Sequence, residues 1–217
     1  MTTRTHRMTF PLSEEDALNL RAGDQVIIDG EIVITAGVPT HERLLRCLDG
    51  LEPAPMDLQG AALFQLGSFS REAPDGKFEL LYLNPTTSTR FNPYMPRLIT
   101  GLRLRAVGGK GGLDENCVEA MRVAGCVYLS FLGGGCTPLT QAVRRVVQVG
   151  WADMLTHYRL VRLEVEGLGP VTVGIDAHGR SLYAEVREQA QQRMPSIIEG
   201  LDRQREEMRP ASGKSGS

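Results

Sequence analysis

The first third of the chain alternates short apolar runs with turn residues, a pattern that predicts a mixture of strands and helices. Ser13 followed by Asp16 is typical of a capped helix, expected over 13–20. Apolar runs on both sides of Asp29-Gly30 predict a β-hairpin, and Thr40 is expected to begin a helix with leucines on one face. Further strands are expected over 61–66 and 78–83, with a turn at Pro74-Asp75-Gly76 between them.

The middle of the chain has the pattern of a βαβ unit. Asn92-Pro93 predicts a short helix that runs to about Thr100. A strand over 104–107, a helix capped by Asp114 and a strand over 126–132 follow, and two strands joined in this way are expected to pair in parallel. Thr137-Pro138 predicts one more helix, whose apolar face comprises Leu139, Val143, Val146 and Val147.

The last third begins with apolar and charged residues in strict alternation, which predicts a strand over 161–165. The turn at 167–170 is expected to reverse the chain into a second strand over 171–175, completing a hairpin. A helix is expected from about Leu182, interrupted at Pro195, and the small polar residues 209–217 are expected to form a disordered tail. Together these elements predict a mixed α/β fold in a single domain over 1–208.

Composition and charge narrow the class of protein. The 217 residues include 24 Lys and Arg and 26 Asp and Glu, a formal charge of −2, which argues against nucleic acid or a membrane surface as a partner. Residues 1–10 contain no apolar segment of a secretory signal. The longest uncharged run, 123–143, is broken by three glycines and a proline, so we expect no membrane span. We expect a cytoplasmic location instead.

The four cysteines do not form a recognisable metal motif. Cys47, Cys117, Cys126 and Cys136 contain no CxxC pair, and no HExxH motif or cluster of metal ligands accompanies them. We therefore expect this chain alone to bind no metal. The chain also lacks residues in a Ser-His-Asp order and an evident pair of catalytic carboxylates.

Three predicted loops contain the candidate functional residues. His41 and Arg43 lie in the first turn of a predicted helix, where acidic residues are the usual choice, so an anion site would explain them; a solvated surface charge is the alternative for Arg43. The second loop, residues 85–90, follows a predicted strand and contains four hydroxyl residues and then Arg90. This composition fits either a ligand site or an ordinary turn. Lys110 stands between two pairs of glycines, which let a backbone approach a ligand closely.

Taken together, Arg43, Arg90 and Lys110 can bind two carboxylates, with Thr86 or a neighbour between them. A small dicarboxylate is therefore the ligand class that these residues favour. His178 is either a proton carrier or a structural histidine hydrogen-bonded to Asp176.

An ordered set of motifs gives the chain a family resemblance from about residue 10 to 200. The motifs are Leu20-Arg-Ala-Gly-Asp24, Thr40-His41-Glu42-Arg43, Pro85-Thr-Thr-Ser-Thr-Arg90, Val107-Gly-Gly-Lys-Gly-Gly112 and Ile175-Asp-Ala-His-Gly179. Together they resemble the β subunit, or C-terminal domain, of class I fumarate hydratases and L-tartrate dehydratases, which are iron–sulfur hydro-lyases.

The resemblance implies a swivelling β/β/α domain that docks on an α subunit. That partner would hold a [4Fe-4S] cluster through three cysteines, and one iron would polarise the departing hydroxyl of the substrate. The implied assembly is of α2β2 type, or a homodimer when the β subunit is isolated. The implied substrates are fumarate and malate first, then tartrate, then mesaconate or another alkyl-substituted diacid.

The resemblance also implies roles for individual residues. Arg43, Arg90 and Lys110 match the dicarboxylate-binding residues of the family, with His41 beside them. Thr86 matches the threonine proposed to remove the carbon-bound proton, with its alkoxide stabilised by Lys110 or by the field of the cluster. The proton donor to the leaving hydroxyl would come from the partner. The stretch 36–42 departs from the family pattern, because an expected arginine near Gly37 and a basic residue at Glu42 are missing. A non-catalytic anion-binding or regulatory module that keeps the fold is therefore the alternative.

Overall fold

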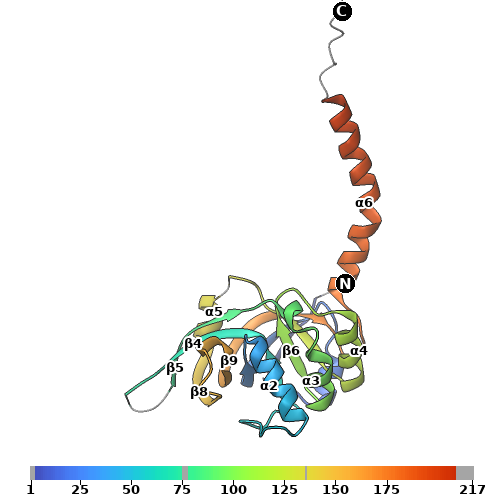
Figure 1. The fold of residues 1–217 in the computed structure, drawn as a ribbon. Helices are drawn as coiled ribbons and strands as arrows, with labels where there is room; N and C mark the ends of the chain where they lie inside the picture. The colour runs from blue at the N-terminus through green and yellow to red at the C-terminus, as the bar shows by residue number, and fades with distance from the viewer. Residues whose placement is uncertain (1–2, 75–77, 135, 209–217) are drawn as a thin grey trace, which may run out of the picture. The chain divides into compact units, whose positions relative to one another are not determined.

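A mixed sheet forms the centre of the first of two units, residues 1–182, in the computed structural model, which describes residues 3–74, 78–134 and 136–208 (Figure 1). Within these residues seven strands follow the order β1-β2-β3-β6-β7-β9-β8. Strand β2 also pairs with β9, so β2, β3, β6, β7 and β9 close into a barrel-like ring. The strands are β1 (Thr5–Phe10), β2 (Gln25–Ile34), β3 (Ala62–Phe64), β6 (Ala106–Gly109), β7 (Val127–Ser130), β8 (Val143–Gly150) and β9 (Leu160–Ile175).

Strands β1, β2, β3, β6 and β7 run parallel, whereas β9 is antiparallel to its neighbours β2, β7 and β8. The predicted βαβ unit is confirmed: α4 (Glu115–Ala124) connects β6 to β7, and the Asp114 side chain accepts a hydrogen bond from the Cys117 amide at its first turn. The predicted fold class, mixed α/β, is confirmed as well. Strand β1 was not predicted, because its exposed edge alternates polar residues with half-buried ones.

The remaining helices of this unit are short. The capped helix expected over 13–20 is α1 (Glu14–Asn19), where Ser13 and Asp16 form a reciprocal capping box. The helix expected from Thr40 is α2 (Val38–Leu48), and the one expected from Asn92 is α3 (Met95–Gly101), preceded by the 3₁₀ turn η1 (Ser88–Phe91). Figure 1 shows α2, α3 and α4 side by side on one face of the sheet.

Two predicted hairpins are instead continuous strands. The chain does not reverse at Asp29-Gly30: β2 runs straight through, and the register with β9 shifts between Ile28 and Gly30. Nor does it reverse at Gly167, which lies opposite in β9 and whose amide donates to the Asp29 carboxylate at 2.8 Å. Glycines with positive φ therefore mark facing irregularities in two long strands, a device that bends a sheet into a barrel.

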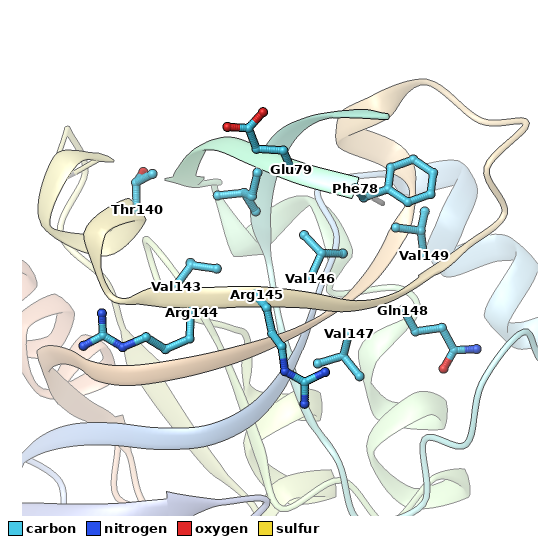
Figure 2. Close-up of a pocket in the computed structure, with 11 residues that line it drawn as sticks. Phe78, Glu79, Thr140, Val143, Arg144, Arg145, Val146, Val147, Gln148 and Val149 are labelled. Carbon is cyan, nitrogen blue, oxygen red and sulfur yellow. The ribbon is translucent and has the colours of Figure 1, made fainter. Parts of the chain in front are cut away.

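The prediction of a helix with Leu139, Val143, Val146 and Val147 on one face is also wrong in its second half. The structure has a short helix α5 (Cys136–Gln141) followed by strand β8, whose register with β9 shifts twice. Because of those shifts, Val143, Val146 and Val149 all point toward strand β5 (Phe78–Pro85), whereas Arg145 and Val147 point away (Figure 2). The spacing of three residues between these valines therefore resembles the apolar face of a helix, although the segment is a strand.

Strand β5 pairs antiparallel with β4 (Leu66–Glu72) in a separate two-stranded sheet. Both predicted strands in this region are confirmed in type, although the first divides into β3 and β4. The turn predicted at Pro74-Asp75-Gly76 lies partly outside the described residues. A cavity of about 650 Å³ separates β5 from β8 (Figure 2).

In the second unit, residues 183–217, the described residues form most of α6 (Leu182–Glu207). This helix continues through Pro195, so the predicted helix is confirmed but the interruption is not. The predicted tail 209–217 lies outside the described residues, and the single domain over 1–208 stays a prediction. Among the helices of the described residues, none combines the length and apolar character needed to cross a membrane.

Candidate functional site

The two loops that follow β5 and β6 lie against each other. The Thr86 amide donates to the Gln65 carbonyl at 2.9 Å, the Lys110 amide to the Thr86 carbonyl at 3.0 Å, and the Ser88 amide to the Lys110 carbonyl at 2.8 Å. Thr87 and Lys110 are thereby paired as a parallel bridge. Residues 86–90 and 110–112, which are far apart in the sequence, therefore form one structure at the carboxyl end of β6.

Three predicted site residues come together at this junction: the side chains of Thr86 and Arg90 make contact, and the Lys110 backbone is joined to the Thr86 carbonyl. The Arg90 Nη2 atom donates to the Thr86 hydroxyl oxygen at 2.7 Å. Thr86 and Lys110 are half-buried and Arg90 is exposed, so a solute can reach the group. Among the described residues, neither Arg90 nor Lys110 has a carboxylate at ion-pair distance, which leaves both positive charges available to an anion.

A third loop lies beside the Lys110 side chain. A Cβ atom built on Gly133, in the turn after β7, would be 3.6 Å from Lys110 Cδ and 4.0 Å from its Nζ. Residue 133 thus borders the site, and a larger side chain there would contact the ammonium group.

A fully buried chain of hydrogen bonds lies beneath the two loops. Ser88 Oγ donates to Gln65 Oε1 at 3.0 Å and lies 2.9 Å from the Tyr128 hydroxyl, to which the Gly112 amide donates at 3.3 Å. Because Ser88 has one hydroxyl hydrogen and gives it to Gln65, Tyr128 donates to Ser88. Sequence reasoning missed Gln65 and Tyr128; the one signal was a polar group inside an otherwise apolar strand segment.

Gly109 is required where the loops touch. A Cβ atom at this position would collide with Ser88 Oγ and would lie 3.0 Å from the Thr86 carbonyl oxygen. Two of the predicted glycines, Gly111 and Gly112, have positive φ, so this segment also needs them for its backbone conformation.

His41 lies next to this site but within the protein interior. Its ring is fully buried, stacks on Phe91 with centroids 4.1 Å apart, and Nδ1 lies 2.7 Å from the Gly37 carbonyl oxygen. Burial lowers the pKa of His41 to about 4, so the imidazole is neutral at pH 7 and donates from Nδ1. Nε2 has no hydrogen-bond partner in the described residues.

Arg43 is not brought to Thr86. Its guanidinium Nε is 3.2 Å from Glu52 Oε1, Nη1 is 3.6 Å from Asp153 Oδ2, and its Cζ lies 4.6 Å from the centre of the Trp151 ring. Two acidic partners already surround this charge. The roles predicted for His41 and Arg43 in binding substrate stay predictions.

The other histidine considered from the sequence has a structural set of contacts. The His178 ring Nε2 lies 2.9 Å from the Leu18 carbonyl oxygen, and its backbone amide donates to Asp176. Asp176 also accepts from the amides of Ala22 and Arg180, so this buried carboxylate organises a turn.

The thiols of this chain do not fit a metal or cluster site. In the described residues, no group of three or more His, Cys, Asp and Glu side chains is placed to hold a metal ion. All four cysteines are free, and burial raises the pKa of Cys117 and of Cys126 far above the usual value, which keeps these thiols protonated. The cavity of Figure 2 is lined by none of the predicted site residues.

Comparison with known proteins gives a consistent set of similarities. The Fumarase C-terminus family matches residues 3–186. The chain is 31% identical over 188 residues to the "Putative L(+)-tartrate dehydratase subunit beta" of Methanocaldococcus jannaschii, a match that covers 86% of this chain and 95% of that protein. It is 30% identical over 194 residues to the "L(+)-tartrate dehydratase subunit beta" of Escherichia coli (strain K12), covering 89% and 94%.

A third similarity is to a longer protein. The chain is 29% identical over 196 residues to the "Putative fumarate hydratase class I" of Geobacillus stearothermophilus, covering 90% of this chain but 37% of that protein.

Proposed function

We propose that this chain, which belongs to the Fumarase C-terminus family, is the β subunit of a hydro-lyase. The enzyme would add water to a small unsaturated dicarboxylate and remove it again. The observation that carries this proposal is the contact between Thr86 and Arg90 beside Lys110, with both cations free of carboxylate partners in the described residues. Malate and fumarate are the first substrates proposed, then tartrate, then mesaconate or another alkyl-substituted diacid. Relatives named tartrate dehydratase subunits make tartrate an essential member of the assay panel.

Each of the three residues has a proposed task. Arg90 and Lys110 bind the two carboxylates of the acid and orient its carbon chain. The Thr86 oxygen removes the carbon-bound proton. A threonine hydroxyl is a weak base, so Thr86 must first give up its own hydroxyl proton to water, and the guanidinium of Arg90, whose Nη2 atom lies 2.7 Å from the Thr86 oxygen, stabilises the resulting alkoxide.

The iron–sulfur cluster belongs to the partner in this proposal. The described residues of this chain offer no ligand set for it, and the tasks proposed for Thr86, Arg90 and Lys110 are binding and proton transfer. The names of the relatives, "subunit beta", support an α subunit as that partner. We also propose a cytoplasmic location, a swivelling β/β/α domain, and an assembly of α2β2 type, or a homodimer when the chain is isolated.

A second candidate function rests on the stretch 36–42. The arginine that the family pattern implies near Gly37 is missing, and Glu42 adds a negative charge whose Oε1 accepts a hydrogen bond from the Tyr94 hydroxyl at 3.1 Å. Less positive charge near the site favours a non-catalytic anion-binding module or a differently substituted acid.

Anaerobic co-expression with the α subunit tests the proposal. The purified complex is expected to turn over malate, L-tartrate or 2-methylmalate, and the chain alone to be colourless and inactive. An intact cluster with no turnover of any of these acids would refute the hydro-lyase function for them. If the chain then still binds malate in calorimetry, the module is the correct alternative.

A further inference from the structure

We infer that Tyr128 is a positioning residue that holds the Lys110 loop against the Thr86–Arg90 loop. This inference rests on the proposed function for its effect on turnover, although the contacts themselves do not depend on it. Tyr128 lies on β7, an element separate from both loops, and its side chain is fully buried.

The hydrogen bonds run in one direction through the site. The Gly112 amide donates to the Tyr128 oxygen, Tyr128 donates to Ser88 Oγ, and Ser88 donates to Gln65 Oε1. Gly112 follows Lys110 by two residues, and Ser88 lies midway between Thr86 and Arg90. The hydroxyl of Tyr128 is therefore the atom through which side-chain bonding connects the catalytic lysine loop to the threonine loop.

The Lys110 loop needs such an anchor because its glycine-rich backbone can adopt many conformations. Gly111 and Gly112 both have positive φ, and glycine loses more conformational freedom on ordering than any other residue. A bond from a rigid strand to the Gly112 amide restricts this freedom two residues from Lys110. Small displacements of reacting groups lower rates steeply, so losing the anchor should affect turnover more than stability.

Removing only the hydroxyl tests the inference. In Tyr128→Phe the ring still fills the core, but Gly112 N–H and Ser88 Oγ lose their shared partner. We expect kcat of the complex with the α subunit to fall roughly tenfold to a hundredfold at a temperature where the protein is fully folded. Hydrogen exchange of the full chain, followed by mass spectrometry, should accelerate in peptides spanning 86–90 and 110–112.

Two control variants separate positioning from a general loss of stability. Tyr82→Phe removes an exposed hydroxyl on β5 and should leave kcat and exchange unchanged. Val26→Ala creates a defect in the core at the other end of the parallel strands; it should lower the melting temperature without changing kcat.

The outcomes separate this inference from the proposed function. A Tyr128→Phe complex with kcat within twofold of the wild type, or unchanged exchange at 110–112, would overturn the inference. If the wild-type complex itself converts none of the acids, the proposed function fails instead, and exchange at 86–90 and 110–112 then decides whether Tyr128 positions the loops.

Discussion

Thr86 and Lys110 have different proposed tasks, so the loss of either side chain should be severe. We expect Thr86→Ala and Lys110→Ala to lower kcat of the complex more than a hundredfold, because one removes the proposed base and the other a proposed carboxylate ligand. Circular dichroism and the melting temperature should stay close to wild type, since both side chains are only half-buried. The control is Thr89→Ala, an exposed threonine of the same loop, which should remain active. Turnover near normal in either site variant would contradict these roles.

His41 should make stability depend on pH. Its folded pKa of about 4 lies below the ordinary value of 6.5, so the folded protein binds fewer protons than the unfolded chain between these values. The stabilisation is complete above pH 6.5 and disappears as the pH falls toward 4, a loss of about 3 kcal/mol at about 1.4 kcal/mol per pKa unit. Urea unfolding at several pH values measures it.

Comparison with a variant that cannot titrate isolates this effect from the acidic residues. His41→Gln should be less stable than wild type at pH 7.5, and the difference should shrink between pH 6.5 and 4. A difference that stays constant with pH would show that His41 does not remain neutral in the folded protein.

The same residues show how far the sequence could predict the site. Thr86, Arg90 and Lys110 were identifiable because hydroxyl and cationic residues stand out after apolar strands, and the structure brings these three together. His41 and Arg43 are two positions apart on a helix, about 200° around its axis, and so they point to different surroundings. Sequence proximity could not reveal that separation. Nor could it distinguish Tyr128 from an ordinary core aromatic residue.

At the scale of elements, the contact between β6 and the loop after β5 depends on one missing side chain. Gly109→Ala would drive a methyl group into Ser88 Oγ and against the Thr86 carbonyl. We expect a loss of about 1–3 kcal/mol in the free energy of unfolding, as for other overpacked sites, together with a large loss of kcat. Chemical denaturation and assay of the complex measure both.

Gly200→Ala provides the matched control, because nothing lies within 4 Å of a Cβ at Gly200 and the residue is in the middle of α6. It should stabilise the helix by roughly 1 kcal/mol or less and leave turnover unchanged. If Gly109→Ala behaved in the same way, the two loops would not need their close approach.

The elements predicted wrongly share a physical cause. Pattern rules assume a regular period of 2 or 3.6, whereas β2, β8 and β9 contain register shifts that change the period locally. Asp29-Gly30 has the composition of a hairpin turn, but tertiary pairing with both halves of β9 keeps the chain extended there. The βαβ unit was predictable because its helix has a regular apolar face and a clear cap at Asp114.

At the scale of the whole molecule, residues 1–182 contain the sheet, its buried core and the candidate site, whereas α6 contributes no buried residue among those described. The match to the family also ends at residue 186. A chain shortened to residues 1–190 should therefore fold, with a melting temperature within a few degrees of the full chain by calorimetry. Its complex with the α subunit should keep full turnover of the dicarboxylate. An unfolded or aggregated 1–190 chain would show that the sheet depends on α6, and a folded but inactive one would show that the helix takes part in function.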